Sequence, residues 1–136
     1  MLFADKIIVM ENFRDLQVGP DPFGRTWHVL FKYLQNGISI RHSDSIDVCF
    51  LLTSGEERMV KVVVLPHADI RNYSARTGRS FSDTWCSRIA LCHLRHVIET
   101  AEDFEKEYLT VTPSEIEQYD SMISKWEAEW VRTHAA

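Results

Sequence analysis

The stretch from Ser80 to Glu99, SFSDTWCSRIALCHLRHVIE, carries the most decisive pattern in the chain. At the helical step of about 100° per residue, its apolar side chains spread over much more than half of the circumference. A helix with so wide an apolar arc has to be covered on several sides. We therefore expect a central buried helix on which the other elements pack. Its apolar residues are Trp85, Cys86, Ile89, Ala90, Cys92, Leu94, Val97 and Ile98.

The half of the chain before this helix has the composition of short strands. Residues 6–10, 26–34, 46–52 and 59–65 are rich in β-branched, aromatic and other apolar side chains. Residues 13–25 contain two glycines and two prolines, which is typical of a loop. These segments predict an antiparallel meander of four to five strands, and the central helix can cover one face of it.

Two turns are predicted from local sequence. Asp21-Pro22-Phe23-Gly24 suits a tight turn, because proline presets φ at the second position and glycine closes the turn. Asn36-Gly37 lies between two apolar pairs and is typical of a two-residue type I′ hairpin. In such a hairpin both turn residues have positive φ, so Asn36 and Gly37 are expected at the tip.

The remaining helices are predicted from their caps. Pro66 and Gly78 bracket a short helix over residues 67–76, and Ser80 with Asp83 resembles a capping box for the central helix. Thr100 and Asp103 repeat that spacing. Thr112-Pro113-Ser114-Glu115 is the clearest helix start. The predicted fold is α+β: a single domain, residues 1–136, with strands first and the central and further C-terminal helices after them.

Composition and charge exclude several classes of protein. The net charge of −5 combines a balance of +2 over residues 1–98 with −7 over residues 99–136. The acidic C-terminal part argues against duplex nucleic acid as a partner. No apolar run approaches the length of a membrane span, and the N-terminus lacks the features of a secretory signal. The three cysteines form no CxxC pair, which favours reduced thiols and a cytoplasmic location.

Cys86 and His93 are the strongest candidates for metal binding or catalysis. They lie seven residues apart, about 20° apart on a helical wheel, and zinc favours nitrogen and sulfur ligands. A structural zinc site needs four ligands, however, and both residues lie within the apolar arc. We therefore expect His93 to be a neutral, hydrogen-bonded core residue and assign no metal, cofactor or catalytic residue. The sequence also lacks the common phosphate-loop and hydrolase motifs.

The loop before the central helix is a candidate anion site. Residues 71–79 hold three arginines and no acidic residue, and they run into a helix N-terminus with free backbone N–H groups. Alternatively, the arginines are solvated or pair with the acidic C-terminal segments, and Asp83 competes for the N–H groups. The predicted anion- or nucleotide-binding residues are Arg71, Tyr73, Arg76, Arg79 and Ser80.

The last helix carries an apolar stripe at alternating spacings of three and four residues, and it is a candidate interface. Tryptophan is enriched in interface hot spots, but these side chains could also belong to the core. The stripe consists of Ile116, Tyr119, Ile123, Trp126 and Trp130.

We therefore expect a binding, regulatory or subunit-type protein that acts by association with a protein partner or with a second copy through this helix. A small-ligand module at residues 71–79 is the alternative, and a Cys/His metal protein or enzyme is the second alternative.

Overall fold

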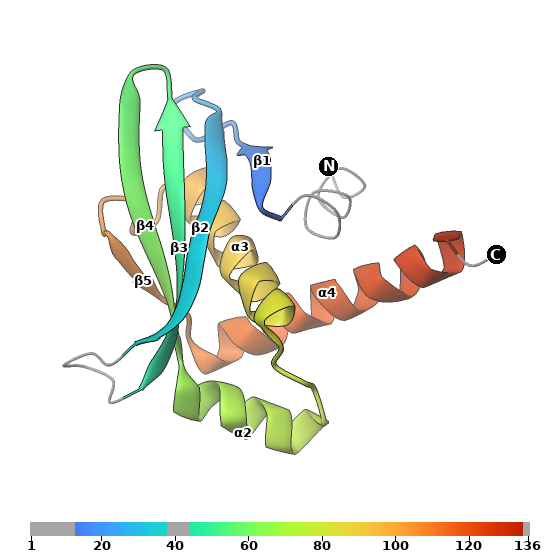
Figure 1. Ribbon diagram of the computed structural model, residues 1–136. Coiled ribbons are helices and arrows are strands. Elements are labelled where there is room, and N and C mark those ends of the chain that lie inside the picture. The colour runs from blue at the N-terminus through green and yellow to red at the C-terminus, as the bar shows by residue number, and fades with distance from the viewer. Residues whose placement is uncertain (1–12, 38–43, 135–136) are drawn as a thin grey trace.

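The computed structural model describes residues 13–37 and 44–134, and a five-stranded sheet is its main layer (Figure 1). The strands lie side by side in chain order, and the first four are antiparallel neighbours. β5 is short and runs parallel to β4 at the edge of the sheet. The strands are β1 (Asp15–Val18), β2 (Trp27–Gly37), β3 (Ser45–Ser54), β4 (Glu57–Pro66) and β5 (Tyr108–Thr110).

Three helices complete the described fold. They are α2 (His67–Thr77), α3 (Asp83–Thr100) and α4 (Pro113–His134). Figure 1 shows α3 against one face of the sheet and α2 at its lower end. α4 packs on α2 and α3, and its C-terminal half projects away from the sheet. This arrangement confirms the predicted α+β fold with a central helix. Among the described helices, none combines the length and the apolar composition needed to span a membrane.

Alternation along β3 explains which face of the sheet is covered. Ile46, Val48, Phe50 and Leu52 are all buried in the main core, as the period-2 pattern predicts. This inner face packs against α3, which has buried residues around almost its whole circumference. Burial of each such large aliphatic or aromatic side chain contributes about 1.5–3 kcal/mol to stability. The core therefore lies between the inner face of the sheet and the helices.

The start of the central helix differs from the prediction. The N-cap is Ser82 rather than Ser80: its Oγ accepts a hydrogen bond from the backbone N–H of Trp85 at 3.2 Å. Two serines, at 80 and 82, precede the apolar arc, and the later one fits the spacing of a helix that begins at Asp83. The start and end of α2 and the start of α4 agree with their predicted caps. Gly78 ends α2 in the left-handed conformation, with φ of 77°.

The predicted type I′ hairpin at Asn36-Gly37 is wrong. Both residues belong to β2 and pair with Ile46 and Ser45 of β3, and neither has positive φ. A Cβ at position 37 would lie 2.3 Å from a carboxylate oxygen of Asp47. Because that oxygen is the end of a side chain that can move aside, the contact does not by itself require glycine.

Two strands lie where the sequence predicted none. β1 falls within the predicted loop over residues 13–25, because Leu16 and Val18 are buried against the core in an otherwise polar segment. β5 follows the predicted cap at Thr100 and Asp103, where the chain turns instead and pairs with β4. The predicted strand over residues 6–10 lies outside the described residues. The turn at Asp21–Gly24 is confirmed by a 3.0 Å hydrogen bond from Gly24 N to Asp21 O.

Candidate ligand-binding pocket

The arginines of the predicted anion site are paired with α4. Arg79 Nε lies 3.0 Å from Asp120 Oδ1, and a second guanidinium nitrogen contacts Glu127. Arg76 lies 3.6 Å from the exposed carboxylate of Glu117. Arg71 and Ser80 are exposed on the surface. An anion at this loop would have to compete with α4, which is the alternative that the charge pattern left open.

Asp120 is the centre of a buried network that joins three helices. Its carboxylate accepts hydrogen bonds from Tyr73 Oη at 2.6 Å and from Trp85 Nε1 at 2.7 Å, besides the contact with Arg79. The rings of Tyr73 and Trp85 stack with centroids 6.2 Å apart. Burial, followed by the hydrogen bond to Asp120, raises the pKa of Tyr73 to about 12. Tyr73 is therefore a neutral structural donor and is not placed to stack on a ligand.

The apolar stripe of α4 is used mainly by the chain's own core. Four of its residues are buried in the main core, and Trp130 is partly buried and makes contacts of its own. A partner could not reach the four buried side chains without opening the fold. The predicted interface residues Tyr119, Ile123 and Trp126 are among these four, together with Ile116.

Cys86 and His93 have separate environments. Cys86 is fully buried, and burial raises the pKa of its thiol to about 12, which leaves it protonated and unreactive. His93 is also buried, and its Nδ1 lies 2.9 Å from Tyr119 Oη. The prediction that His93 is a buried, hydrogen-bonded residue is confirmed. Within residues 13–37 and 44–134, no three metal-ligating side chains come together.

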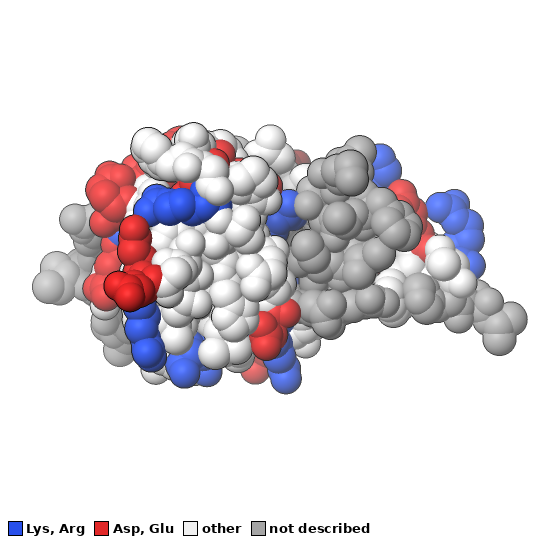
Figure 2. All heavy atoms as spheres, turned by 90° about the horizontal axis from the view of Figure 1, so that it is seen from above, with Lys and Arg blue, Asp and Glu red and all other residues white. Residues whose placement is uncertain are grey.

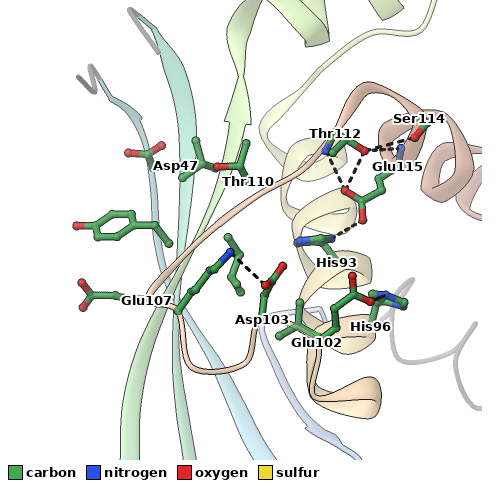
Figure 3. A pocket seen from close by; sticks show the side chains of 15 residues that line it. Asp47, His93, His96, Glu102, Asp103, Glu107, Thr110, Thr112, Ser114 and Glu115 are labelled. Carbon is green, nitrogen blue, oxygen red and sulfur yellow. Dashed lines mark hydrogen bonds and ion pairs between the residues drawn. The ribbon is translucent and has the colours of Figure 1, made fainter. Parts of the chain in front are cut away.

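A pocket of about 1030 Å³ lies where α3, β5 and the start of α4 meet (Figure 3). Figure 3 shows its two halves: Asp47 and Glu107 lie on one side of β5, and His93 and Glu115 lie on the other. Three apolar residues, Val64, Val97 and Leu109, also line it, and all three are buried. The remaining lining residues are His96, Glu102, Asp103, Lys106, Tyr108, Thr110, Thr112 and Ser114.

The predicted capping box positions one wall of this pocket. Glu115 Oε1 accepts a hydrogen bond from Thr112 N at 2.9 Å, and Thr112 Oγ1 accepts one from Glu115 N at 3.3 Å. The other carboxylate oxygen of Glu115 lies 3.6 Å from His93 Nδ1. The helix start therefore fixes a carboxylate beside the buried imidazole, as Figure 3 shows.

The opposite wall is the turn over residues 101–107, and a lysine of β4 binds its backbone. The buried ammonium of Lys61 donates hydrogen bonds to the backbone carbonyls of Phe104 and Lys106. Ala101 and Asp103 adopt the left-handed conformation, and Asp103 forms an ion pair with Lys106 at 3.1 Å. The two hydrogen bonds from Lys61 and the ion pair between Asp103 and Lys106 therefore fix the conformation of this turn.

The pocket is strongly acidic. Five carboxylates line it, against the single ammonium of Lys106: Glu102, Asp103 and Glu115 lie on the His93 side of β5, and Asp47 and Glu107 lie on the other side. From above, acidic side chains gather at the left of the molecule, the side on which β5 lies in Figure 1 (Figure 2). The charge excess of residues 99–136 is therefore divided between α4, where it pairs with arginines, and this pocket.

The environment of His93 predicts a pH dependence of stability. Burial lowers the pKa of His93 below the ordinary value of 6.5, against the opposing effect of Glu115. The unfolded chain therefore binds a proton at this residue more readily than the folded chain. Stability should fall as the pH drops below about 6.5, and should be independent of this group at higher pH.

Urea denaturation at a series of pH values measures this effect. The His93→Gln variant should lose part of the slope between pH 6.5 and 5. The variant His96→Gln, at an exposed histidine of the same helix, should keep most of it, because burial and not the charge of His96 is the main cause of the lowered pKa of His93. An unchanged slope in His93→Gln would contradict the predicted proton uptake.

Comparison with known proteins does not assign the chain to a family, because no protein-family model, no curated protein and no solved structure matches it. The functional evidence is therefore the geometry of the pocket. Sequence reasoning missed this site because its residues come from β3, β4, α3, the 101–107 turn, β5 and α4. The signal that pointed towards it was the excess of acidic residues after position 98.

Proposed function

We propose that the chain is a binding protein whose pocket accepts an organic cation, an amine or a guanidinium on an apolar body. The observation that carries the proposal is the excess of carboxylates around a partly apolar cavity. The carboxylates of the lining attract a positive head group, and the apolar part of the lining contacts the body of the ligand. An organic cation fits this lining better than a bare metal ion, since no three ligating side chains converge among the described residues.

The hydrogen bonds of the hydroxyl and imidazole groups in the pocket favour binding over catalysis. The hydroxyls of Thr112 and Ser114 lie 3.4 Å from each other, and Thr112 also bonds Glu115. The Nδ1 atom of His93 is hydrogen-bonded to the hydroxyl of Tyr119, which belongs to the core. This hydrogen bond does not connect the imidazole to a serine or threonine hydroxyl that it could activate as a nucleophile. The neutral imidazole adds no positive charge that would repel a cation.

The test uses three probes that share one aromatic body and differ in head-group charge: tyramine, tyrosol and 3-(4-hydroxyphenyl)propanoate. Thermal unfolding is followed at constant ionic strength with increasing probe. A ligand that binds the folded state raises the melting temperature in proportion to the logarithm of its concentration above Kd. We expect a rise with tyramine, little with tyrosol and none with the propanoate.

A double variant links the effect to the pocket. Glu102→Gln/Asp103→Asn removes two carboxylates from the lining and should weaken tyramine binding by about tenfold or more. Asparagine tolerates the left-handed conformation of position 103, so the turn should keep its shape. The control Glu56→Gln removes a carboxylate from the β3–β4 turn, outside the pocket, and should leave binding unchanged. Equal stabilisation by all three probes would contradict the proposal.

A further inference from the structure

The outer face of the sheet, opposite α3, carries exposed apolar side chains. Tyr33, Val60 and Tyr108 are 45%, 42% and 61% exposed. They surround a small buried cluster, separate from the main core, formed by Cys49, Val62 and Val64. None of the described helices packs on this face (Figure 1). Large aromatic and aliphatic groups grouped in this way are typical of an interaction surface rather than of scattered surface residues.

The strand register orders these side chains into two adjacent apolar rows. In one row, Tyr33 pairs with Cys49, Cys49 with Val62, and Val62 with Tyr108. In the next row on the same face, Leu30 pairs with Leu51, and Leu51 with Val60. The two rows lie on either side of the Phe50–Lys61 pair, whose side chains point to the inner face.

The charges at the two ends of these rows are opposite. Beyond the Leu51–Val60 pair, the next pair on the outer face is Thr53 with Arg58. Beyond the Cys49–Val62 pair, the next is Asp47 with Val64. Arg58 and Asp47 are therefore equally far from the centre of the face, one at each end. The middle of the face is mainly apolar, although Lys32 and Glu107 line a second pocket there beside Tyr33 and Val60. With a basic group at one end and an acidic group at the other, the face is complementary to its own reversed copy.

We propose that two copies of this chain pack outer face to outer face about a two-fold axis that runs across the strands, near the level of Phe50. This axis reverses the strand direction, so the Arg58 end of one copy lies over the Asp47 end of the other. The row containing Tyr33 and Tyr108 then lies over the Leu51–Val60 row of the second copy. Each residue makes the same contact twice, as in other two-fold interfaces, and the sheets lie about 10 Å apart.

Sedimentation equilibrium tests this assembly over a range of concentrations. The wild-type chain, of 15.9 kDa, should approach twice that mass as concentration rises. Val60→Glu places an acidic group in the centre of the face, where the side chain is already partly exposed, and should weaken the dimer at least tenfold without unfolding the chain. The matched control Val131→Glu makes the same change on α4, where valine is 64% exposed, and should leave the dimer intact.

A charge exchange tests the direction of packing. Arg58→Glu should weaken the dimer, and Arg58→Glu/Asp47→Arg should restore much of it, because the axis brings each Arg58 over the Asp47–Val64 pair of the second copy, one strand away from Asp47. A wild-type monomer at every concentration would overturn the proposal, and so would equal effects of Val60→Glu and Val131→Glu. Failure of Asp47→Arg to compensate Arg58→Glu would overturn the reversed arrangement. Circular dichroism of every variant, compared with the wild type, confirms that the sheet is retained.

Discussion

Replacing Asp120 by alanine is expected to lower the free energy of unfolding by about 3–5 kcal/mol. The carboxylate is buried, and its removal leaves Arg79 with Glu127 but without its second carboxylate partner, and leaves the Tyr73 hydroxyl and the Trp85 indole N–H without acceptors. Each buried donor that loses its partner costs about 1–3 kcal/mol. The three donors come from α2, from the loop after it and from α3, so Asp120 joins α4 to three separate parts of the fold, in addition to the apolar contacts of the helix.

Urea denaturation followed by circular dichroism measures the loss. Glu117→Ala is the matched control, since it removes a carboxylate of the same helix whose ion pair with Arg76 is exposed. Exposed pairs contribute about 0–1 kcal/mol, so Glu117→Ala should be nearly neutral. Similar losses in the two variants would contradict the role of Asp120 as the centre of a buried network.

The second large effect is expected for Trp27→Ala, with a loss of about 3–5 kcal/mol in the free energy of unfolding. Trp27 is completely buried, its Nε1 donates to Asp21 at 3.1 Å, and its ring lies 5.4 Å from that of Phe104. The substitution leaves a cavity in place of the indole, and the carboxylate of Asp21 loses one of its hydrogen-bond donors. Because Phe104 belongs to the 101–107 turn, the cavity also lies beneath one wall of the pocket.

Phe23→Ala serves as the control for Trp27→Ala. Phe23 is an aromatic residue of the neighbouring turn and is 77% exposed, so its loss should change stability by less than about 0.5 kcal/mol. Trp27→Ala should also weaken tyramine binding, whereas Phe23→Ala should not. A stable Trp27→Ala variant, or one with unchanged tyramine affinity, would show that the indole does not support the turn.

The elements that were predicted correctly are those whose pattern is local. The wide apolar arc of α3, the alternation of β3 and the capping box at Thr112 and Glu115 each follow from neighbouring residues. Their side chains meet the same kind of environment in almost any fold of this class. Local pattern therefore identified the helices and the long strands.

The errors arose where distant contacts decide the local structure. Gly37 lies in a strand because it pairs with Ser45 of β3, although Asn-Gly is typical of a turn. β5 is only three residues long and forms because β4 offers a free edge. Neither partner strand can be identified from the short segment itself, since pairing at this distance is set by the tertiary fold.

The candidate site shows the same limit. The three arginines at residues 71–79 and the acidic residues after position 98 were both visible in the sequence. The structure pairs Arg76 and Arg79 with α4 and leaves a second group of carboxylates around the pocket. Charge pattern alone could not divide the acidic residues between these two sets, because the division depends on which of them lie on α4 opposite the arginines.

The proposed cation site is tested most directly by nuclear magnetic resonance during titration of the ¹⁵N-labelled chain with tyramine. We predict saturable shifts at the His93 imidazole, at the amides of residues 102–106 and at the amides of residues 112, 114 and 115, all with one dissociation constant. These are the residues of the two walls and of the histidine between them. Shifts that do not saturate, or that appear at residues 71–79 and not in the pocket, would contradict the proposed site.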